Sequence, residues 1–87
     1  MSDINSTGEI HIGPSYFPDG KVVPELMTTD EVIVFLRIPE ISKAEDYRNT
    51  IDNLVRFRGL PRILICNRRL FPRQAVLEWI NSETVRN

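Results

Sequence analysis

The chain has 87 residues, of which 41% are hydrophobic, and its formal net charge is −1. This length allows one small domain with a modest core and argues against a deep catalytic cavity. The sequence has neither a run of about 18 apolar residues nor a basic segment followed by an apolar one at the N-terminus, so we expect a cytoplasmic protein without a signal peptide or membrane span.

Residues 1–24 are predicted to form a largely irregular N-terminal extension. They contain three glycines and three prolines and show no sustained hydrophobic period. Polar and apolar side chains alternate over residues 9–12, which is compatible with one short strand. His11 is the only histidine of the chain. No cysteine or second histidine lies near it in sequence, so we expect a surface residue rather than a metal ligand or a general base.

The first predicted helix begins within Thr28–Glu31. Thr28 and Glu31 have the spacing of a capping box, and Asp30 and Glu31 complement the positive end of the helix dipole. The helix must end before Pro39, because the residue before a proline is disfavoured in the helical conformation. We expect a short, largely buried helix followed by a turn over residues 37–41.

A second, longer helix is predicted from Ser42 to Gly59. Ser42 and Glu45 repeat the capping-box spacing, and glycine is the residue type that most often ends a helix. Apolar side chains recur at steps of three and four along one face: Ala44, Tyr47, Ile51, Leu54 and Val55. The opposite face is polar: Arg48, Asn49, Asp52, Asn53 and Arg56.

This polar face has two interpretations. Arginine and asparagine can bind base edges and phosphates, and the second helix of a helix-turn-helix unit enters the major groove. Alternatively, it is an ordinary solvated face on which Asp52 and Arg56 form a pair at i, i+4. The arginine-rich segment that follows favours the first interpretation.

Arg62–Phe71 is predicted to form a β-hairpin with Asn67-Arg68 at its tip. Ile63–Cys66 is apolar at every position, so we expect this strand to be buried on both sides. Cys66 is the only cysteine, and we interpret it as a small buried hydrophobe. Because it has no second thiol for a disulfide or a zinc site, we predict no metal, and the sequence indicates no cofactor.

The charges are unevenly distributed along the chain. Residues 1–35 hold one cation and six acids, whereas residues 36–87 hold ten cations and six acids. Six arginines lie between positions 56 and 73, where no acid occurs: Arg56, Arg58, Arg62, Arg68, Arg69 and Arg73. This pattern favours a hairpin that lies against a phosphate backbone. The interpretation requires these guanidinium groups to converge on one surface; groups that are scattered, or paired inward with acids, would contradict it.

The last predicted helix spans Pro72–Ile80, with the proline in its first turn. Val76, Trp79 and Ile80 share one face, and we expect them to pack on the first two helices. Trp79 is interpreted as a core anchor rather than a platform for a nucleobase. We expect Glu83 to face solvent and residues 83–87 to form a frayed tail.

Four segments resemble the small excisionase-type, MerR-like winged helix-turn-helix domains. They are Leu26–Val32, with its Thr-Thr-x-Glu-Val start, Leu60–Ile63, with its Leu-Pro, Arg68–Phe71, and Val76–Ile80, with its Glu-Trp-Ile. The resemblance covers roughly residues 26–81. It implies an α+β fold of three helices plus a two-stranded β-hairpin wing, within a DNA-binding domain over residues 25–82.

The resemblance also implies which residues contact DNA. In the recognition helix they are Arg48, Asn49, Thr50, Asn53 and Arg56. In the wing they are Arg62, Asn67, Arg68 and Arg69. The chain departs from the family in a longer connection between Leu36 and Tyr47. It also has an acid at Asp52, where many members carry an aromatic residue, and this acid would repel a phosphate unless Arg48 or Arg56 neutralises it.

Members of that family bind neighbouring repeats beside a recombination site, bend the DNA and help a tyrosine recombinase to excise an integrated element. The resemblance therefore implies an excisionase, or recombination directionality factor, of a mobile genetic element that binds double-stranded DNA cooperatively. A domain this small offers a limited contact area, so tight binding requires several copies or a partner. The acidic N-terminal segment is a candidate surface for a neighbour's basic face.

Two alternatives remain open at this point. One is a transcriptional regulator that uses the same DNA contacts. The other is a protein-interaction module on the same scaffold, in which Asp52 and the acidic first third mark a lost DNA surface. We do not expect an enzyme, because the sequence contains no Ser/His/Asp, Cys/His, paired-carboxylate or glycine-rich phosphate-loop arrangement.

Overall fold

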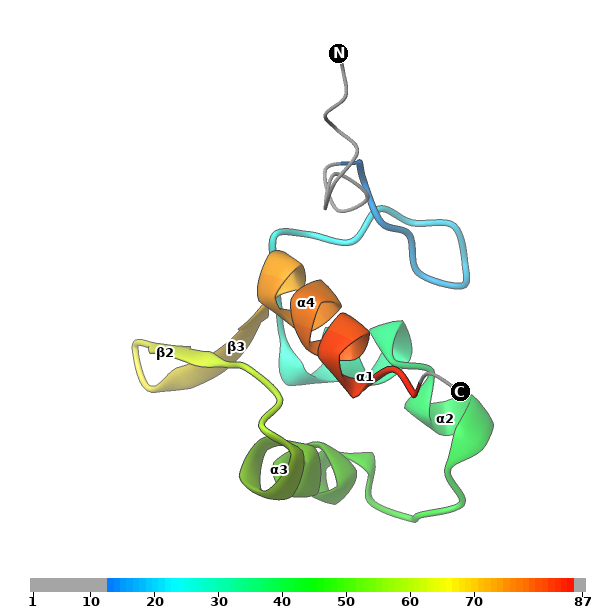
Figure 1. The fold of residues 1–87 in the computed structure, drawn as a ribbon, viewed down its shortest axis with the longest axis vertical. Helices are drawn as coiled ribbons and strands as arrows, with labels where there is room; N and C mark the ends of the chain where they lie inside the picture. Colours follow the sequence, from blue (N-terminus) through cyan, green and yellow to red (C-terminus); the bar gives the residue numbers. More distant parts are fainter. Residues whose placement is uncertain (1–12, 86–87) are drawn as a thin grey trace.

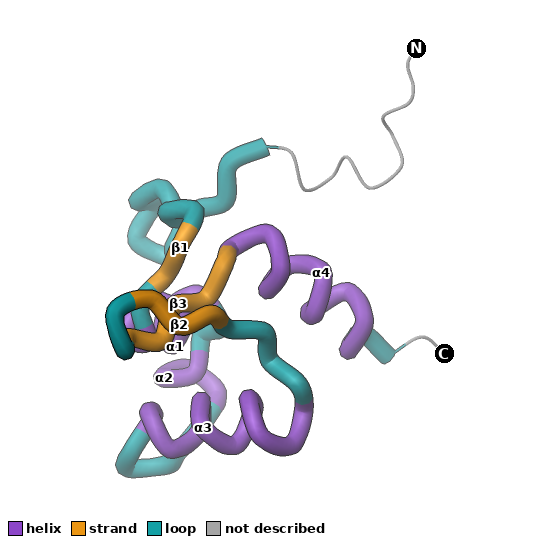
Figure 2. The backbone as a smooth tube through the Cα atoms, turned by 90° about the vertical axis from the view of Figure 1, so that its left-hand side faces the viewer, coloured by secondary structure: helices purple, strands orange, loops and turns teal. Residues whose placement is uncertain are grey.

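The structure is a computed structural model that describes residues 13–85. Within this range the elements follow one another as β1 (Leu26–Met27), α1 (Thr29–Phe35), α2 (Ile38–Ile41), α3 (Tyr47–Arg58), β2 (Ile63–Ile65), β3 (Arg68–Pro72) and α4 (Arg73–Glu83) (Figures 1 and 2). The predicted α+β class is confirmed, but the described part holds one helix and one strand more than predicted. His11 and the predicted strand at residues 9–12 lie outside the described residues.

The three strands form one antiparallel sheet in the order β1-β3-β2. Met27 pairs with Phe71 across β1 and β3, and Ile63 pairs with Leu70 across β2 and β3. β3 is therefore the central strand, and β2 is an edge. The prediction that residues 63–66 are buried on both sides is wrong, because side chains on this short edge strand are exposed on both faces.

The hairpin turns at Cys66-Asn67 and not at the predicted Asn67-Arg68. Ile65 pairs with Arg68, which leaves Cys66 and Asn67 as a two-residue loop. Both have positive φ, 51° and 62°, as a type I′ turn requires to match the twist of its strands. Cys66 therefore sits at the tip and is exposed, which corrects the prediction that it is buried.

The predicted start of α1 is confirmed. The Glu31 N–H donates to the Thr28 hydroxyl at 3.2 Å, and the Thr28 N–H donates to the Glu31 carboxylate at 2.9 Å, which completes a capping box. The helix ends at Phe35, before Pro39 as predicted. The predicted turn over residues 37–41 is instead a single helical turn, α2, with the proline near its start, where no N–H is needed.

The start of α3 differs from the prediction, whereas its end agrees. The helix begins at Tyr47 rather than within Ser42–Glu45, because the Asp46 carboxylate caps it by accepting the N–H of Arg48 at 3.0 Å. Gly59 ends the helix with φ 74°, as predicted. The longer connection before α3 thus holds α2 and a short loop.

The core gathers buried side chains from the N-terminal segment, the sheet, the four helices and the segment after α3: Val23, Met27, Val32, Ile33, Ile38, Ile51, Leu60, Phe71 and Val76. Trp79 packs against this cluster as predicted, and its indole N–H donates to the carbonyl of Arg58 at 2.8 Å. Ile80, predicted on the same face, is 37% exposed. In residues 13–85, none of the helices has the length and apolar character needed to cross a membrane.

Candidate nucleic-acid interface

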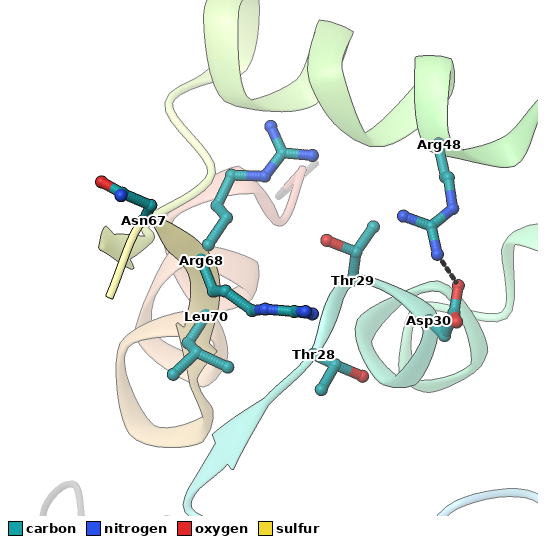
Figure 3. A pocket seen from close by; sticks show the side chains of 8 residues that line it. Thr28, Thr29, Asp30, Arg48, Asn67, Arg68 and Leu70 are labelled. Atoms are coloured by element: carbon teal, nitrogen blue, oxygen red, sulfur yellow. Dashed lines mark hydrogen bonds and ion pairs between the residues drawn. The ribbon is translucent and has the colours of Figure 1, made fainter. Parts of the chain in front are cut away.

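An open hollow of about 430 Å³ lies between the start of α1, the start of α3 and the tip of the hairpin. The side chains that line it are Thr28, Thr29, Asp30, Arg48, Asn67, Arg68, Arg69 and Leu70. Figure 3 shows Arg48 and Arg68 on either side of Thr29. Four of the nine residues predicted to contact DNA therefore meet at one place, although they come from α3 and from the hairpin.

The other five predicted residues lie outside the hollow. Asn49, Asn53 and Arg56 are exposed, and their spacing of four and three residues places them on one outward face of α3. Thr50 is half-buried on the flank of this helix, and Arg62 is exposed just before β2. The structure thus offers two neighbouring groups, the lined hollow and the outward face of α3, rather than one continuous cluster.

Two arginines of the basic run face acids elsewhere and do not line the hollow. The Arg58 guanidinium lies 2.6 Å from the Glu83 carboxylate, which joins the end of α3 to the end of α4. Glu83, predicted to face solvent, is therefore paired. The Arg73 guanidinium lies 3.1 Å from the Glu25 carboxylate, and Arg73 is 7% exposed. Both residues serve the fold, because their charges are already bound by acids.

Arg69 lines the hollow but is also paired. Its guanidinium lies 2.7 Å from the Asp52 carboxylate and 5.5 Å from the centre of the Phe71 ring. The sequence left open whether Arg48 or Arg56 neutralises Asp52, and the structure pairs Asp52 with neither of them. A residue on the central strand reaches the acid instead, because the hairpin lies beside α3. The ion pair connects the hairpin to α3. Because Arg69 neutralises the Asp52 carboxylate, this acid repels a nearby phosphate less strongly.

Arg48 is held more loosely. It lies 2.9 Å from Asp30 in the first turn of α1, and the two side chains are 62% and 74% exposed (Figure 3). An ion pair this open to water contributes about 0–1 kcal/mol. Arg48 can therefore exchange the Asp30 carboxylate for another anion at little cost.

Arg56, Arg62 and Arg68 have no acid within ion-pair distance among residues 13–85. Arg68 lines the hollow. Arg56, in the last turn of α3, and Arg62, just before β2, lie outside it. The convergence that the sequence interpretation requires is thus met only in part. Three of the six arginines in the basic run are paired with acids, and three are available to an external anion.

Thr28 and Thr29 also line the hollow, and the sequence interpretation assigned Thr28 only a capping role. Hydroxyl and backbone N–H groups are common donors to phosphate oxygens. The sequence does show that both threonines lie at the start of a helix, where donor groups are available. It does not show that the hairpin tip lies opposite this helix start, because that placement depends on the tertiary structure.

No group of three or more His, Cys, Asp or Glu side chains within residues 13–85 is arranged to hold a metal ion. Comparisons with protein-family models, with curated proteins and with solved structures gave no match. The residues of this chain and their geometry are therefore the basis for assigning a function.

Proposed function

We propose that this chain is a winged helix-turn-helix domain that binds double-stranded DNA. In this proposal α3 is the recognition helix in the major groove, and the hairpin of β2 and β3 is the wing on the adjacent backbone. The observation that carries the proposal is that hairpin tip and α3 flank one hollow, with Arg68 on one side and Arg48 on the other. A phosphate in this hollow would have a guanidinium group on each side.

The proposed contacts divide into two kinds. Arg68, Arg62 and Arg48 bind phosphate oxygens and set the orientation of the domain on the duplex, but they do not read sequence. Asn49, Asn53 and Arg56, on the outward face of α3, bind base edges: asparagine pairs with adenine and arginine with guanine. Arg69 is assigned a positioning role, because its guanidinium is already bound to Asp52.

The proposed biological role is that of an excisionase, or recombination directionality factor, which assists a tyrosine recombinase. Its support is the sequence resemblance, together with the small contact area that one copy offers to DNA. Several copies on neighbouring repeats would bind cooperatively, since each bound copy raises the effective concentration of the next. The role is tested by an excision assay with the recombinase encoded nearest to this gene, followed by detection of the circular junction.

DNA binding itself is tested by fluorescence anisotropy with labelled duplexes that tile the genomic neighbourhood of the gene. We expect one or more duplexes to bind at low salt more tightly than a shuffled duplex of the same composition. If micromolar protein binds none of them, the DNA proposal is contradicted. If binding occurs but the circular junction forms equally well without the protein, the transcriptional-regulator alternative replaces the excisionase.

A protein-interaction module remains the second candidate, and one observation favours it. Acids neutralise half of the arginines in the basic run and also hold Arg48. Arginines that are already paired with acids of the same chain are compatible with a domain that does not bind DNA. The absence of any DNA binding in the anisotropy experiment would select this candidate.

A further inference from the structure

Phe57 is the most exposed aromatic residue in the described range, at 72%, and it does not belong to the core cluster. It lies six residues after the buried Ile51, which turns its side chain roughly 120° away from the core side of α3. It follows Asn53 by four residues, so these two side chains are neighbours on the helix surface. Phe57 therefore borders the outward face of α3 and is an apolar ring beside polar side chains.

Arg56 lies against this ring. Its guanidinium is 5.7 Å from the centre of the Phe57 ring, and the cation–π contact favours a position of the arginine beside the ring. Arg56 has no acid within ion-pair distance among residues 13–85, and in the proposed complex it binds a guanine. The separation is less than the rise of two base pairs, about 6.8 Å. A group that touches the ring therefore lies within about two base pairs of that guanine.

The major groove offers such a ring one apolar partner. Thymine presents a C5 methyl group there, whereas the edges of the other three bases present hydrogen-bond donors and acceptors without a methyl group. Placed against a donor or an acceptor, the ring would displace water and offer no hydrogen bond in return, which is costly. Placed against the methyl group, the ring buries apolar area on both sides of the contact.

We propose that Phe57 is a specificity-determining residue that contacts the C5 methyl group of a thymine within about two base pairs of the guanine bound by Arg56. This inference rests on the DNA proposal and extends it, because the nine residues predicted to contact DNA do not include Phe57 and are all polar. The target then contains a guanine that is bound through hydrogen bonds and a nearby thymine that is bound through an apolar contact.

The test replaces single thymines by uracil in the duplex that binds most tightly in the tiling experiment. Uracil pairs with adenine as thymine does and lacks only the methyl group, so the substitution removes the proposed contact without removing a hydrogen bond. At one position we expect the affinity of the wild type to fall about threefold to fivefold, the factor that corresponds to one buried methyl-sized group. Fluorescence anisotropy at a fixed salt concentration measures the change.

Phe57→Ala is the matching change in the protein. The position is exposed, so the fold should be retained, which circular dichroism verifies. This variant should bind the thymine duplex at least about threefold more weakly than the wild type does, and uracil at the sensitive position should weaken it no further. Ile41→Ala is the control: Ile41 lies on α2 and is 74% exposed, so this variant should keep the wild-type response to uracil.

The outcomes distinguish this inference from the DNA proposal. If the wild type binds none of the duplexes, both are contradicted. If it binds but no uracil substitution lowers its affinity, the thymine contact alone is overturned. A Phe57→Ala variant that responds to uracil as strongly as the wild type would also overturn it, because the methyl group would then be contacted by another residue.

Discussion

The Asp52 carboxylate on α3 lies 2.7 Å from the Arg69 guanidinium on β3. The same guanidinium lies 5.5 Å from the ring centre of Phe71, which is fully buried in the central strand. One arginine thus connects the core, the hairpin and α3. We infer that this pair fixes the angle between the proposed wing and the proposed recognition helix, and that Asp52 is a positioning residue rather than an obstacle to DNA.

The Asp52–Arg69 pair is expected to contribute measurably to stability. Its side chains are 45% and 26% exposed, so solvent weakens the interaction, and we expect a coupling free energy of about 0.5–1 kcal/mol. Urea unfolding of Asp52→Ala, Arg69→Ala and the double variant measures it. The Arg37–Glu40 pair, with exposures of 60% and 51%, serves as the control and should give about 0.3 kcal/mol. A smaller coupling at Asp52–Arg69 than at Arg37–Glu40 would contradict the assignment.

Two phenylalanines with opposite burial provide a test of the core. Phe71 is fully buried, whereas Phe57 is 72% exposed. Phe71→Ala should lower the free energy of unfolding by about 3–5 kcal/mol, since it removes buried apolar area and leaves a cavity. Phe57→Ala should change it by no more than about 0.5 kcal/mol. Chemical denaturation followed by Trp79 fluorescence compares the two, and equal effects would show that β3 is not central to the core.

Local signals in the sequence were sufficient for the ends of helices. The Thr28–Glu31 capping box and the glycine at position 59 each depend on residues within one or two helical turns, and both are confirmed. The failed cap at Ser42–Glu45 shows the limit of such signals. Asp46 competes for the same role, and the Ser42 hydroxyl instead accepts the N–H of Ala44 in a local turn.

Long-range features could not be predicted from the same signals. Whether Ile63–Cys66 is central or an edge depends on which strand pairs with β3 on its other side, and the two-residue strand β1 gave no hydrophobic period to reveal it. The partner of Asp52 depends on the same arrangement. The sequence therefore predicted that arginines lie on the hairpin and on α3. It did not predict which arginine pairs with which acid, because that depends on the tertiary structure.

The hairpin turn is expected to be stabilised by a change of two residues. Cys66 and Asn67 both have positive φ, and most residues other than glycine and asparagine pay roughly 1–2 kcal/mol for this conformation. The double substitution Cys66→Asn and Asn67→Gly creates the Asn-Gly pair that type I′ turns favour. We expect a gain of about 1 kcal/mol in the free energy of unfolding, measured by thermal and urea unfolding. A loss of stability would indicate a different turn.

Asp30 is expected to weaken DNA binding, because its charge lies in the proposed phosphate site. Asp30→Asn removes this charge and releases Arg48, so affinity at low salt should rise about fivefold, the equivalent of about 1 kcal/mol for charges about 4 Å apart in water. Stability should fall by about 0.3–1 kcal/mol, because the acid also favours the start of α1. Glu78→Gln is the control: it removes the same charge from an exposed position on α4. Equal gains from both variants would indicate a non-specific effect of net charge.

The dependence of DNA affinity on salt in the Arg68→Ala variant tests the central claim most directly. Fluorescence anisotropy over a range of salt concentrations gives the slope of log affinity against log salt, with Arg37→Ala, an exposed cation outside the hollow, as the matched control. If Arg68 binds a phosphate, its loss should weaken binding to all sequences and reduce the magnitude of the slope by about 0.9, whereas Arg37→Ala leaves it unchanged. An identical slope and affinity for wild type and Arg68→Ala would contradict a DNA interface formed by the hairpin.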